Sequence, residues 1–341
     1  MLKSAMLGCG GRAKGHAKAY EHVKKTRLVA VCDMNEQRLH PFAQEFNVPQ
    51  KYTDVHEMLR KEKPDILHIV TQPNLRVQLL TLAHEAKVPA VIVEKPLALD
   101  SADFKAIREL SKTTTTKMCV NHQLRFHPRL LDLLSDVQEG RIGDVQFIDA
   151  SSRLNLAGQG THVLNLVFWM NGGMHPDLVF GNACGASQFA GTHPAPDMAV
   201  AQLNFPNRVR CLIANGVNAL ATSDDPKNHM HKRIAVYGTR GFVHWKMMSW
   251  ERSTMKVPFE SGEKEYRDED VLGQAGLTDA MCDWLADDKK VHPNCLEQSL
   301  AETNTVLGLY ASTVYSKPIN LPYEPEDGLL AKLRAKLEQQ A

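Results

Sequence analysis

The chain has 341 residues, of which 43% are hydrophobic and 23% are charged, a composition typical of a globular protein with a sizeable core. The formal net charge of +1 argues against a broad electrostatic surface for nucleic acid or membrane, and no long apolar run indicates a membrane span. The N-terminal residues lack the pattern of a signal peptide, so we expect a cytoplasmic protein. Seven scattered cysteines without a CxxC pair favour reduced thiols over a disulfide framework or zinc site.

The first part of the chain alternates short apolar runs with helical stretches. Strands are predicted at 4–8, 28–33, 66–72, 90–95 and 117–122, with helices between them such as 35–46 and 76–86. Continuous apolar runs are typical of strands buried on both faces, and their alternation with helices predicts a parallel sheet.

The rest of the chain is richer in consecutive strands. Strands are predicted at 144–154, 183–189, 198–205 and 208–217, followed by a hairpin over 233–247 that turns near Gly241. Helices are predicted at 161–171, where Gly172 and Gly173 end the helix, and near 276–287 and 295–315. Together these indicate an open, largely antiparallel sheet with helices on one face, and an α/β fold for the whole chain.

The first predicted strand leads into the sequence LGCGGRAKGHAKAY at 7–20. Gly8 permits a tight turn, Gly10 lets the backbone approach a pyrophosphate, and Ala13 allows the helix to pack closely on the strand. The helix N-terminus supplies amide donors, and Arg12 adds a positive charge for the phosphates. Because the motif follows a strand and opens a helix, it indicates a dinucleotide-binding Rossmann fold.

Asp33 ends the next predicted strand, at the distance from the glycines that this fingerprint requires. A carboxylate there accepts hydrogen bonds from a ribose 2′-hydroxyl and repels a 2′-phosphate, so NAD is favoured over NADP. Two observations leave the choice open: Asp33 is also suited to cap the following helix, and Arg38 lies close by in sequence.

The segment VIVEKPLALD at 91–100 places Lys95 at the end of a buried strand, followed by a proline. The carboxyl ends of strands in such sheets face the ligand crevice. A lysine there is partly desolvated, which lowers its pKa. The alternative is a solvated lysine at a strand end.

Four motifs resemble the Gfo/Idh/MocA family of oxidoreductases: GCGGRAKGH, VTQPN at 70–74, EKP at 94–96 and NHQLRFHP at 121–128. The similarity extends through RIGDV at 141–145 and GTHVLNLVFWMNG at 160–172. It implies a Rossmann domain over 1–122 and an α/β domain with a large open sheet over 123–341, which binds substrate and joins subunits. Homodimers or homotetramers are implied.

The resemblance also implies roles for residues near the cofactor. Lys95 would hydrogen-bond the reacting hydroxyl, Glu94 would lie near the nicotinamide ribose, and Pro96 would be cis. Asn121 and Arg125 would lie near nicotinamide and substrate. The expected cofactor-binding set is Gly8, Gly10, Gly11, Arg12, Ala13, Asp33, Thr71, Pro73, Asn74, Glu94, Lys95, Asn121 and Arg125.

His162 is similar to the catalytic histidine of the family. It falls in the first turn of a predicted helix, where the positive end of the helix dipole keeps the ring neutral and able to accept a hydroxyl proton. The alternative is a histidine that packs or caps there. The chain departs from the family in having Gly158 where an aspartate is common, with Gln159 and Asn165 as neutral neighbours. The site is therefore expected to be less acidic.

The expected substrate-binding residues are Lys95, Gln159, His162, His175 and Trp245. Asp177 and the loop at 223–231 are further candidates, and for Trp245 the alternative is packing within the sheet. His229 and His231 form an HxH pair, but a metal site needs a third ligand, so no metal is expected.

Three functions remain open from the sequence. The first is an NAD-dependent oxidoreductase that acts on a secondary hydroxyl of a sugar, glycoside or cyclitol. The second is a glycoside hydrolase or lyase that works through a transient 3-keto sugar and retains its NAD. The third is a non-catalytic NAD-binding module, which the absence of an aspartate at Gly158 favours and the presence of Lys95 and His162 disfavours.

Overall fold

The computed structural model describes residues 1–339 of the chain. Contacts divide the chain into two compact units. The first comprises Met1–Ala98, Lys105–Phe126 and Asp268–Leu300, and the second comprises Leu99–Phe104, His127–Arg267 and the described residues from Ala301 on. The predicted single boundary after residue 122 stays a prediction. The first unit found from contacts also includes the late segment Asp268–Leu300.

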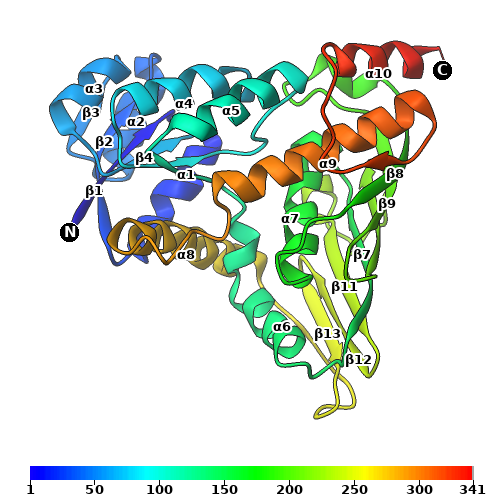
Figure 1. Ribbon diagram of the computed structural model, residues 1–341. Coiled ribbons are helices and arrows are strands. Elements are labelled where there is room, and N and C mark those ends of the chain that lie inside the picture. Colours follow the sequence, from blue (N-terminus) through cyan, green and yellow to red (C-terminus); the bar gives the residue numbers. More distant parts are fainter. Residues whose placement is uncertain (340–341) are drawn as a thin grey trace. The chain divides into compact units, whose positions relative to one another are not determined.

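The first unit is built on a six-stranded parallel sheet of order β3-β2-β1-β4-β5-β6, which is the Rossmann order (Figure 1). Its strands are β1 Leu2–Leu7, β2 Thr26–Cys32, β3 Gln50–Tyr52, β4 Ile66–Ile69, β5 Ala90–Val93 and β6 Lys117–Val120. The five predicted parallel strands are therefore confirmed. The short strand β3 was not expected, because only Tyr52 of its three residues is buried.

Helices cover both faces of this sheet. They are α1 Gly11–Lys18, α2 Glu36–Glu45, α3 Val55–Glu62, α4 Arg76–Glu85 and α5 Ser101–Thr113. Successive side chains of a strand point to opposite faces. Ala5 of β1 accordingly joins the core under α3, α4 and α5, while Met6 joins the core under α1 and α2.

Helix α8, Tyr266–Ala286, belongs with this sheet from Asp268 on. Its Leu277, Met281 and Cys282 pack with Ile66 of β4 and Ile92 of β5. The helix starts ten residues before the predicted 276–287 segment, and its contacts explain why this late stretch groups with the Rossmann unit.

The second unit is built on a nine-stranded sheet of order β14-β13-β12-β11-β7-β10-β9-β8-β15 (Figure 1). Its strands are β7 Val145–Ser152, β8 Leu178–Cys184, β9 Met198–Asn204, β10 Arg210–Gly216, β11 Lys232–Gly238, β12 Gly241–Lys246, β13 Ser249–Ser253, β14 Glu260–Glu263 and β15 Ile319–Asn320. The β7–β10 pair is parallel and the other pairs are antiparallel, which confirms the predicted open, mostly antiparallel sheet and the hairpin between β11 and β12.

One predicted strand was misplaced. The segment 183–189 was expected to be extended, but β8 ends at Cys184 and a 3₁₀ turn, Ser187–Ala190, follows. Gly185 has a φ of +75°, and the carboxylate of Asp197 accepts hydrogen bonds from the backbone N–H groups of Ser187 and Gln188. This local capping competes with a strand in a way that the apolar pattern does not reveal.

The remaining helices are α6 Pro128–Gln138, α7 Thr161–Met170, α9 Leu296–Tyr315 and α10 Leu329–Glu338. Every residue of α7 is buried, as the helix lies against β7 and β11 on one face of the sheet (Figure 1). The other face carries exposed apolar side chains, namely Phe180, Val200, Leu212 and Tyr237.

All seven cysteines are free thiols. None of the helices in the described part of the chain combines the length and hydropathy that a membrane span requires.

Candidate active site

The glycine-rich turn lies where β1 ends, beside the end of β4. Gly8 has a φ of +100°, and a Cβ there would lie 2.3 Å from the carbonyl oxygen of Val70. No side chain fits that approach, so Gly8 is required by the tight turn between β1 and α1. In this strand order, β1 and β4 flank the switch point, the place where ligands bind in such sheets.

The next two glycines have open space above them. A Cβ on Gly10 or Gly11 would meet no heavy atom within 4 Å. Gly10 is the N-cap of α1 and makes no side-chain capping bond, which leaves the first N–H groups of the helix for a ligand. Ala13 is fully buried where α1 meets the sheet. A pyrophosphate therefore fits this cradle by shape and by donor chemistry.

Arg12 does not point at this cradle. Its Nε donates to Oε1 of Glu94 at 2.9 Å, and its Nη2 donates to Oε1 of Gln274 at 3.1 Å. The expectation that Arg12 adds its charge to the phosphates is therefore not reproduced. The guanidinium instead neutralises a buried carboxylate of its own unit.

Asp33 follows β2 and lies beside the glycine turn. Its Oδ2 accepts a hydrogen bond from the backbone N–H of Cys9 at 2.9 Å, and its Oδ1 accepts one from the N–H of Asn35 at 2.9 Å. The cap of α2 is Asn35, whose side chain accepts from Gln37 N, so the alternative that Asp33 caps this helix is wrong. The two backbone donors fix the carboxylate at the end of β2.

The loop after β4 adds one orphaned group. The Thr71 hydroxyl oxygen is buried and has no hydrogen-bond partner among the described residues. Pro73 is buried at the start of a 3₁₀ turn, Pro73–Leu75, and Asn74 is exposed. An unpaired buried hydroxyl beside an open glycine cradle supports a bound ligand there.

Lys95 is the second residue after β5 and is partly buried. The Lys95–Pro96 peptide bond is cis, as the resemblance implied. Burial lowers the pKa of Lys95, Glu94 acts to raise it, and Arg12 and Arg76 act to lower it. Arg76 was not singled out in the sequence, although its side chain is fully buried on α4 and its Nε donates to the carbonyl of Pro96 at 3.3 Å.

Asn121 and Arg125 hold parts of the first unit together. The amide of Asn121 is fully buried and donates to Oε1 of Glu94 at 2.7 Å. Arg125 donates from Nη1 to the carbonyl of Pro293 at 2.9 Å. His122 lies between these two residues in the sequence. Burial is the largest cause that lowers its pKa to about 3, and the positive charge of Lys95 is the next. Contact of Asn121 and Arg125 with a cofactor stays a prediction.

His162 lies in the second unit, in the first turn of α7, and its side chain is buried. A single π-helical turn, Leu156–Gly160, precedes α7, and such turns are frequent at functional sites. The side chain of Asn155 caps this turn by accepting from the N–H of Gly158 at 2.7 Å. A Cβ on Gly158 would lie 2.8 Å from that same oxygen, so a side chain here would require the capping amide of Asn155 to shift.

Gly160 completes the turn. A Cβ there would lie 2.7 Å from Oδ1 of Asn215 on β10. Both polar atoms of the Asn215 amide are buried without a hydrogen-bond partner in the described residues. Asn165, the other neutral residue noted from the sequence, donates to Oε1 of Glu302 at 2.7 Å and so joins α7 to α9.

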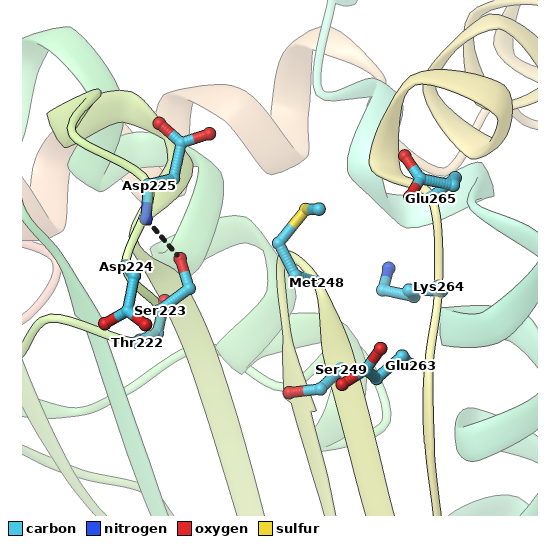
Figure 2. Close-up of a pocket in the computed structure, with 9 residues that line it drawn as sticks. All are labelled: Thr222, Ser223, Asp224, Asp225, Met248, Ser249, Glu263, Lys264 and Glu265. Carbon is cyan, nitrogen blue, oxygen red and sulfur yellow. Dashed lines mark hydrogen bonds between the residues drawn. The ribbon is translucent and has the colours of Figure 1, made fainter.

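A cavity of about 650 Å³ opens at one end of the large sheet (Figure 2). Figure 2 shows its three walls: the loop after β10, the β12–β13 turn, and the segment that leaves β14. The lining residues are Thr222, Ser223, Asp224, Asp225, Met248, Ser249, Glu263, Lys264 and Glu265. In the register of the sheet, these segments and the segment from β7 to His162 leave from the same end.

His231 fixes the loop wall of this cavity. Its Nδ1 accepts from the N–H of Thr222 at 3.1 Å, and its Nε2 donates to the carbonyl of Asp225 at 2.7 Å. Both ring nitrogens are therefore committed to the loop. In residues 1–339, no group of three or more His, Cys, Asp or Glu side chains is placed to hold a metal ion.

Two expected substrate residues lie elsewhere. His175 follows the C-terminal end of α7, where the centre of its ring lies 5.5 Å from that of Phe168. His162 lies in the first turn of the same helix, which has ten residues and a length of about 15 Å. Trp245 is fully buried, with Lys264 Nζ 4.4 Å from its ring centre, so the alternative of sheet packing is the correct one. Gln159 lies partly exposed in the π-turn, and its contact with substrate stays a prediction.

Comparison with known proteins places residues 2–122 in a family described as oxidoreductases with an NAD-binding Rossmann fold, GFO_IDH_MocA. The chain is 30% identical to a D-apiose dehydrogenase from Paraburkholderia graminis over 42% of its own length and 38% of that protein's length. It is 22% identical to a myo-inositol 2-dehydrogenase from Thermotoga maritima, over 71% of this chain and 74% of that protein.

The fold is also that of solved oxidoreductases. An oxidoreductase from Agrobacterium radiobacter, solved with NAD⁺, L-tartaric acid and magnesium, matches with a TM-score of 0.80 at 18% identity. The match covers 94% of this chain and 98% of that one. The likeness therefore extends over both units.

We predict that two alanine substitutions in the glycine turn affect different properties: Gly8→Ala lowers stability, and Gly11→Ala weakens NAD binding. Gly8→Ala should lower the free energy of unfolding by about 2 kcal/mol or more, because the left-handed φ and the Val70 carbonyl both oppose a Cβ. Gly11→Ala should leave the melting temperature unchanged, because its Cβ meets no heavy atom within 4 Å, but should weaken NAD binding at least about tenfold, because it adds bulk at the helix N-terminus where we place the pyrophosphate. Thermal denaturation and calorimetric titration with NAD measure both, and full NAD affinity in Gly11→Ala would contradict the assigned cradle.

Proposed function

We propose that this chain, which belongs to the NAD-binding Gfo/Idh/MocA oxidoreductases through its residues 2–122, is a dehydrogenase of sugars, glycosides or cyclitols. It would transfer a hydride between a nicotinamide and a secondary hydroxyl of the substrate. The observation that carries this proposal is Lys95, an ammonium group held in a partly desolvated position after β5 beside the buried carboxylate of Glu94.

The proposed chemistry assigns one role to each of two side chains. Lys95 donates a hydrogen bond to the oxygen of the reacting hydroxyl and stabilises the negative charge that grows on it. His162 accepts the proton of that hydroxyl at a ring nitrogen as the C–H bond breaks. The nicotinamide, when bound, supplies the hydride acceptor.

We propose NAD rather than NADP as the cofactor. Asp33 is held by two backbone donors with its negative charge at the end of β2, next to the glycine turn. A carboxylate in this position accepts from a 2′-hydroxyl, whereas a 2′-phosphate would meet a like charge.

The proposed substrate is neutral or cationic. The cavity at the end of the large sheet is lined by four carboxylates and one ammonium group, a formal charge of −3, together with the hydroxyls of Thr222, Ser223 and Ser249. Hydroxyl and carboxylate acceptors suit the many donors of a polyol. A phosphorylated or acidic sugar would be repelled by the excess of negative charge.

We propose that a second copy of the chain covers the free face of the large sheet. Phe180, Val200, Leu212 and Tyr237 lie on four strands of this face and are 41% to 49% exposed. Phe180 and Leu212 both lie in register with Gln202, which places them in one row across β8, β9 and β10. Apolar side chains grouped in this way are typical of a protein interface.

The activity is tested by following NADH absorbance with NAD or NADP on a panel of neutral sugars and cyclitols. Lys95→Ala should lower kcat about 10²- to 10³-fold, because one hydrogen-bond donor to the developing oxyanion is lost. Lys61→Ala, at an exposed lysine of α3 that pairs with Glu57, is the control and should retain full activity. An unchanged kcat in Lys95→Ala would refute the assigned role, and release of an aglycone without net NADH would identify redox-assisted cleavage instead.

The charge preference is tested with three hexoses that differ in charge: glucose, glucosamine and glucose 6-phosphate. We expect kcat/KM for the phosphate to be lower than for the other two by about tenfold or more. The double change Glu263→Gln and Glu265→Gln should narrow this gap, while Glu57→Gln on α3 should not alter it. Preferential oxidation of the phosphate by the unchanged protein would contradict the assignment.

The oligomer is tested by sedimentation velocity. The protein should sediment as a dimer or tetramer, and Leu212→Lys should shift it towards the monomer, because a charge would be buried in the interface. Lys332→Ala on α10, away from this sheet face, serves as the control. A monomer for the unchanged chain would rule out the proposed interface.

A further inference from the structure

The partly buried Tyr20 and the buried His68, His16 and Glu94 of the first unit form a continuous row that ends at Glu94. The Tyr20 hydroxyl lies 2.9 Å from Nε2 of His68. Nδ1 of His68 lies 3.2 Å from Nδ1 of His16, and Nε2 of His16 lies 2.9 Å from Oε1 of Glu94. His16 and His68 are 1% and 0% exposed, so water does not provide their partners. The activity proposed above gives no role to Tyr20, His68 or His16.

A second row reaches the same oxygen and has a direction that the chemistry fixes. Arg12 can only donate, so the Gln274 atom that it contacts is the carbonyl oxygen. The Gln274 NH₂ therefore faces Oδ1 of Asn121 at 2.9 Å, and the Asn121 NH₂ faces Oε1 of Glu94 at 2.7 Å. With Arg12 Nε, two donors already point at this oxygen.

The donors and the charges around Glu94 together determine its ionisation. Because Oε1 already accepts from Arg12 and Asn121, it cannot itself carry the proton of a carboxylic acid. Burial alone would raise the pKa of Glu94, but Arg12 and His16 outweigh it and hold that pKa well below its usual range.

The anion in turn fixes both histidine tautomers. His16 must donate from Nε2 to Glu94, and burial, the largest influence, lowers its pKa and keeps the ring neutral, so its Nδ1 is an acceptor. His68 must then donate from Nδ1 and accept at Nε2, and the Tyr20 hydroxyl donates to it. Asn121 Nδ2 and His16 Nε2 lie 3.1 Å apart because both donate to the same acceptor, Oε1 of Glu94, and not because they bond to each other.

We propose that the row Tyr20–His68–His16 is a positioning array of fixed direction, which holds the Glu94 carboxylate as an oriented anion beside Lys95. His16 and His68 are positioning residues rather than catalytic ones. Each member donates to the next, and all of them end on one carboxylate oxygen. The proposed role of Lys95 as a donor to the substrate oxygen then depends on an array that lies behind it.

The same charges argue against proton transfer along the row. Transfer from Tyr20 to Glu94 would create a tyrosinate and a carboxylic acid. Burial raises the pKa of Tyr20, and the pKa of Glu94 is held low, so both ends oppose the transfer. The row therefore holds charge in place and does not conduct protons.

The array has a predicted effect on pH dependence. Burial lowers the pKa of Lys95, the charge of Glu94 raises it, and Arg12 of α1 and Arg76 of α4 lower it. The other titratable or polar groups around Lys95 and Glu94 are Asn121, His122, and Asp270 and Gln274 of α8. Weakening the hold on Glu94 lowers the pKa of Lys95, so its charged form is lost at a lower pH.

The first test needs no substrate. Long-range ¹H–¹⁵N spectra of histidine-labelled protein should show His16 protonated at Nε2 and His68 protonated at Nδ1, with assignments from single substitutions. Both rings should keep these tautomers through the neutral pH range. The opposite tautomer in either ring would overturn the proposal, whatever the protein proves to catalyse.

The second test rests on the proposed dehydrogenase activity. His68→Leu removes the donor to His16. In the plot of kcat/KM against pH, the fall of activity at alkaline pH, the alkaline limb, should then shift to a lower pH, by on the order of half to one pH unit. His68→Asn keeps an N–H donor near the position of Nδ1 and should restore the limb, and His56→Leu at an exposed histidine of α3 should not move it.

The two tests fail separately. If no sugar yields NADH but the tautomers are as stated, the proposed function fails and the array stands. If the unchanged protein is active but His68→Leu loses only thermal stability, with the pH limb in place, the row is merely structural and the proposal is wrong.

Discussion

One carboxylate oxygen organises the first unit. Oε1 of Glu94 accepts from Arg12 at 2.9 Å, from His16 at 2.9 Å and from Asn121 at 2.7 Å. A buried anion is tolerated only when it is paired and hydrogen-bonded, and here α1, the end of β5, the segment after β6 and α8 all contribute to that pairing. The elements that surround the proposed cofactor cradle are thus tied together by the need to satisfy one charge.

This constraint also explains where Arg12 points. From the sequence, an arginine in a phosphate-binding turn is expected to face the phosphates. In the fold it faces Glu94, because an unpaired carboxylate buried beside it would cost several kcal/mol. The phosphates are left to the N–H groups of α1 and to the open space above Gly10 and Gly11.

The second unit meets its own constraint at the turn before α7. The π-turn brings Gly158 against the Asn155 amide and Gly160 against Asn215, so a side chain at either position would require these amides to shift. The π-turn itself carries no acidic residue, whereas four carboxylates line the cavity at the end of the sheet. Within the second unit, the turn before His162 is therefore less acidic than the wall of the cavity.

Local signals in the sequence determined the parallel strands, the glycine turn, the position of Lys95 after β5 and His162 at the start of α7, because periodicity and turn chemistry act between near neighbours. The sequence could not show that α8 packs on the Rossmann sheet or that Arg12 pairs with Glu94. Nor could it show that His175 and His162 lie at opposite ends of α7, or that the Trp245 ring is buried against Lys264. Each of these depends on residues far apart in the chain that compete for one buried charge or one apolar surface. Such competition is decided only when the elements pack, so tertiary structure alone determined it.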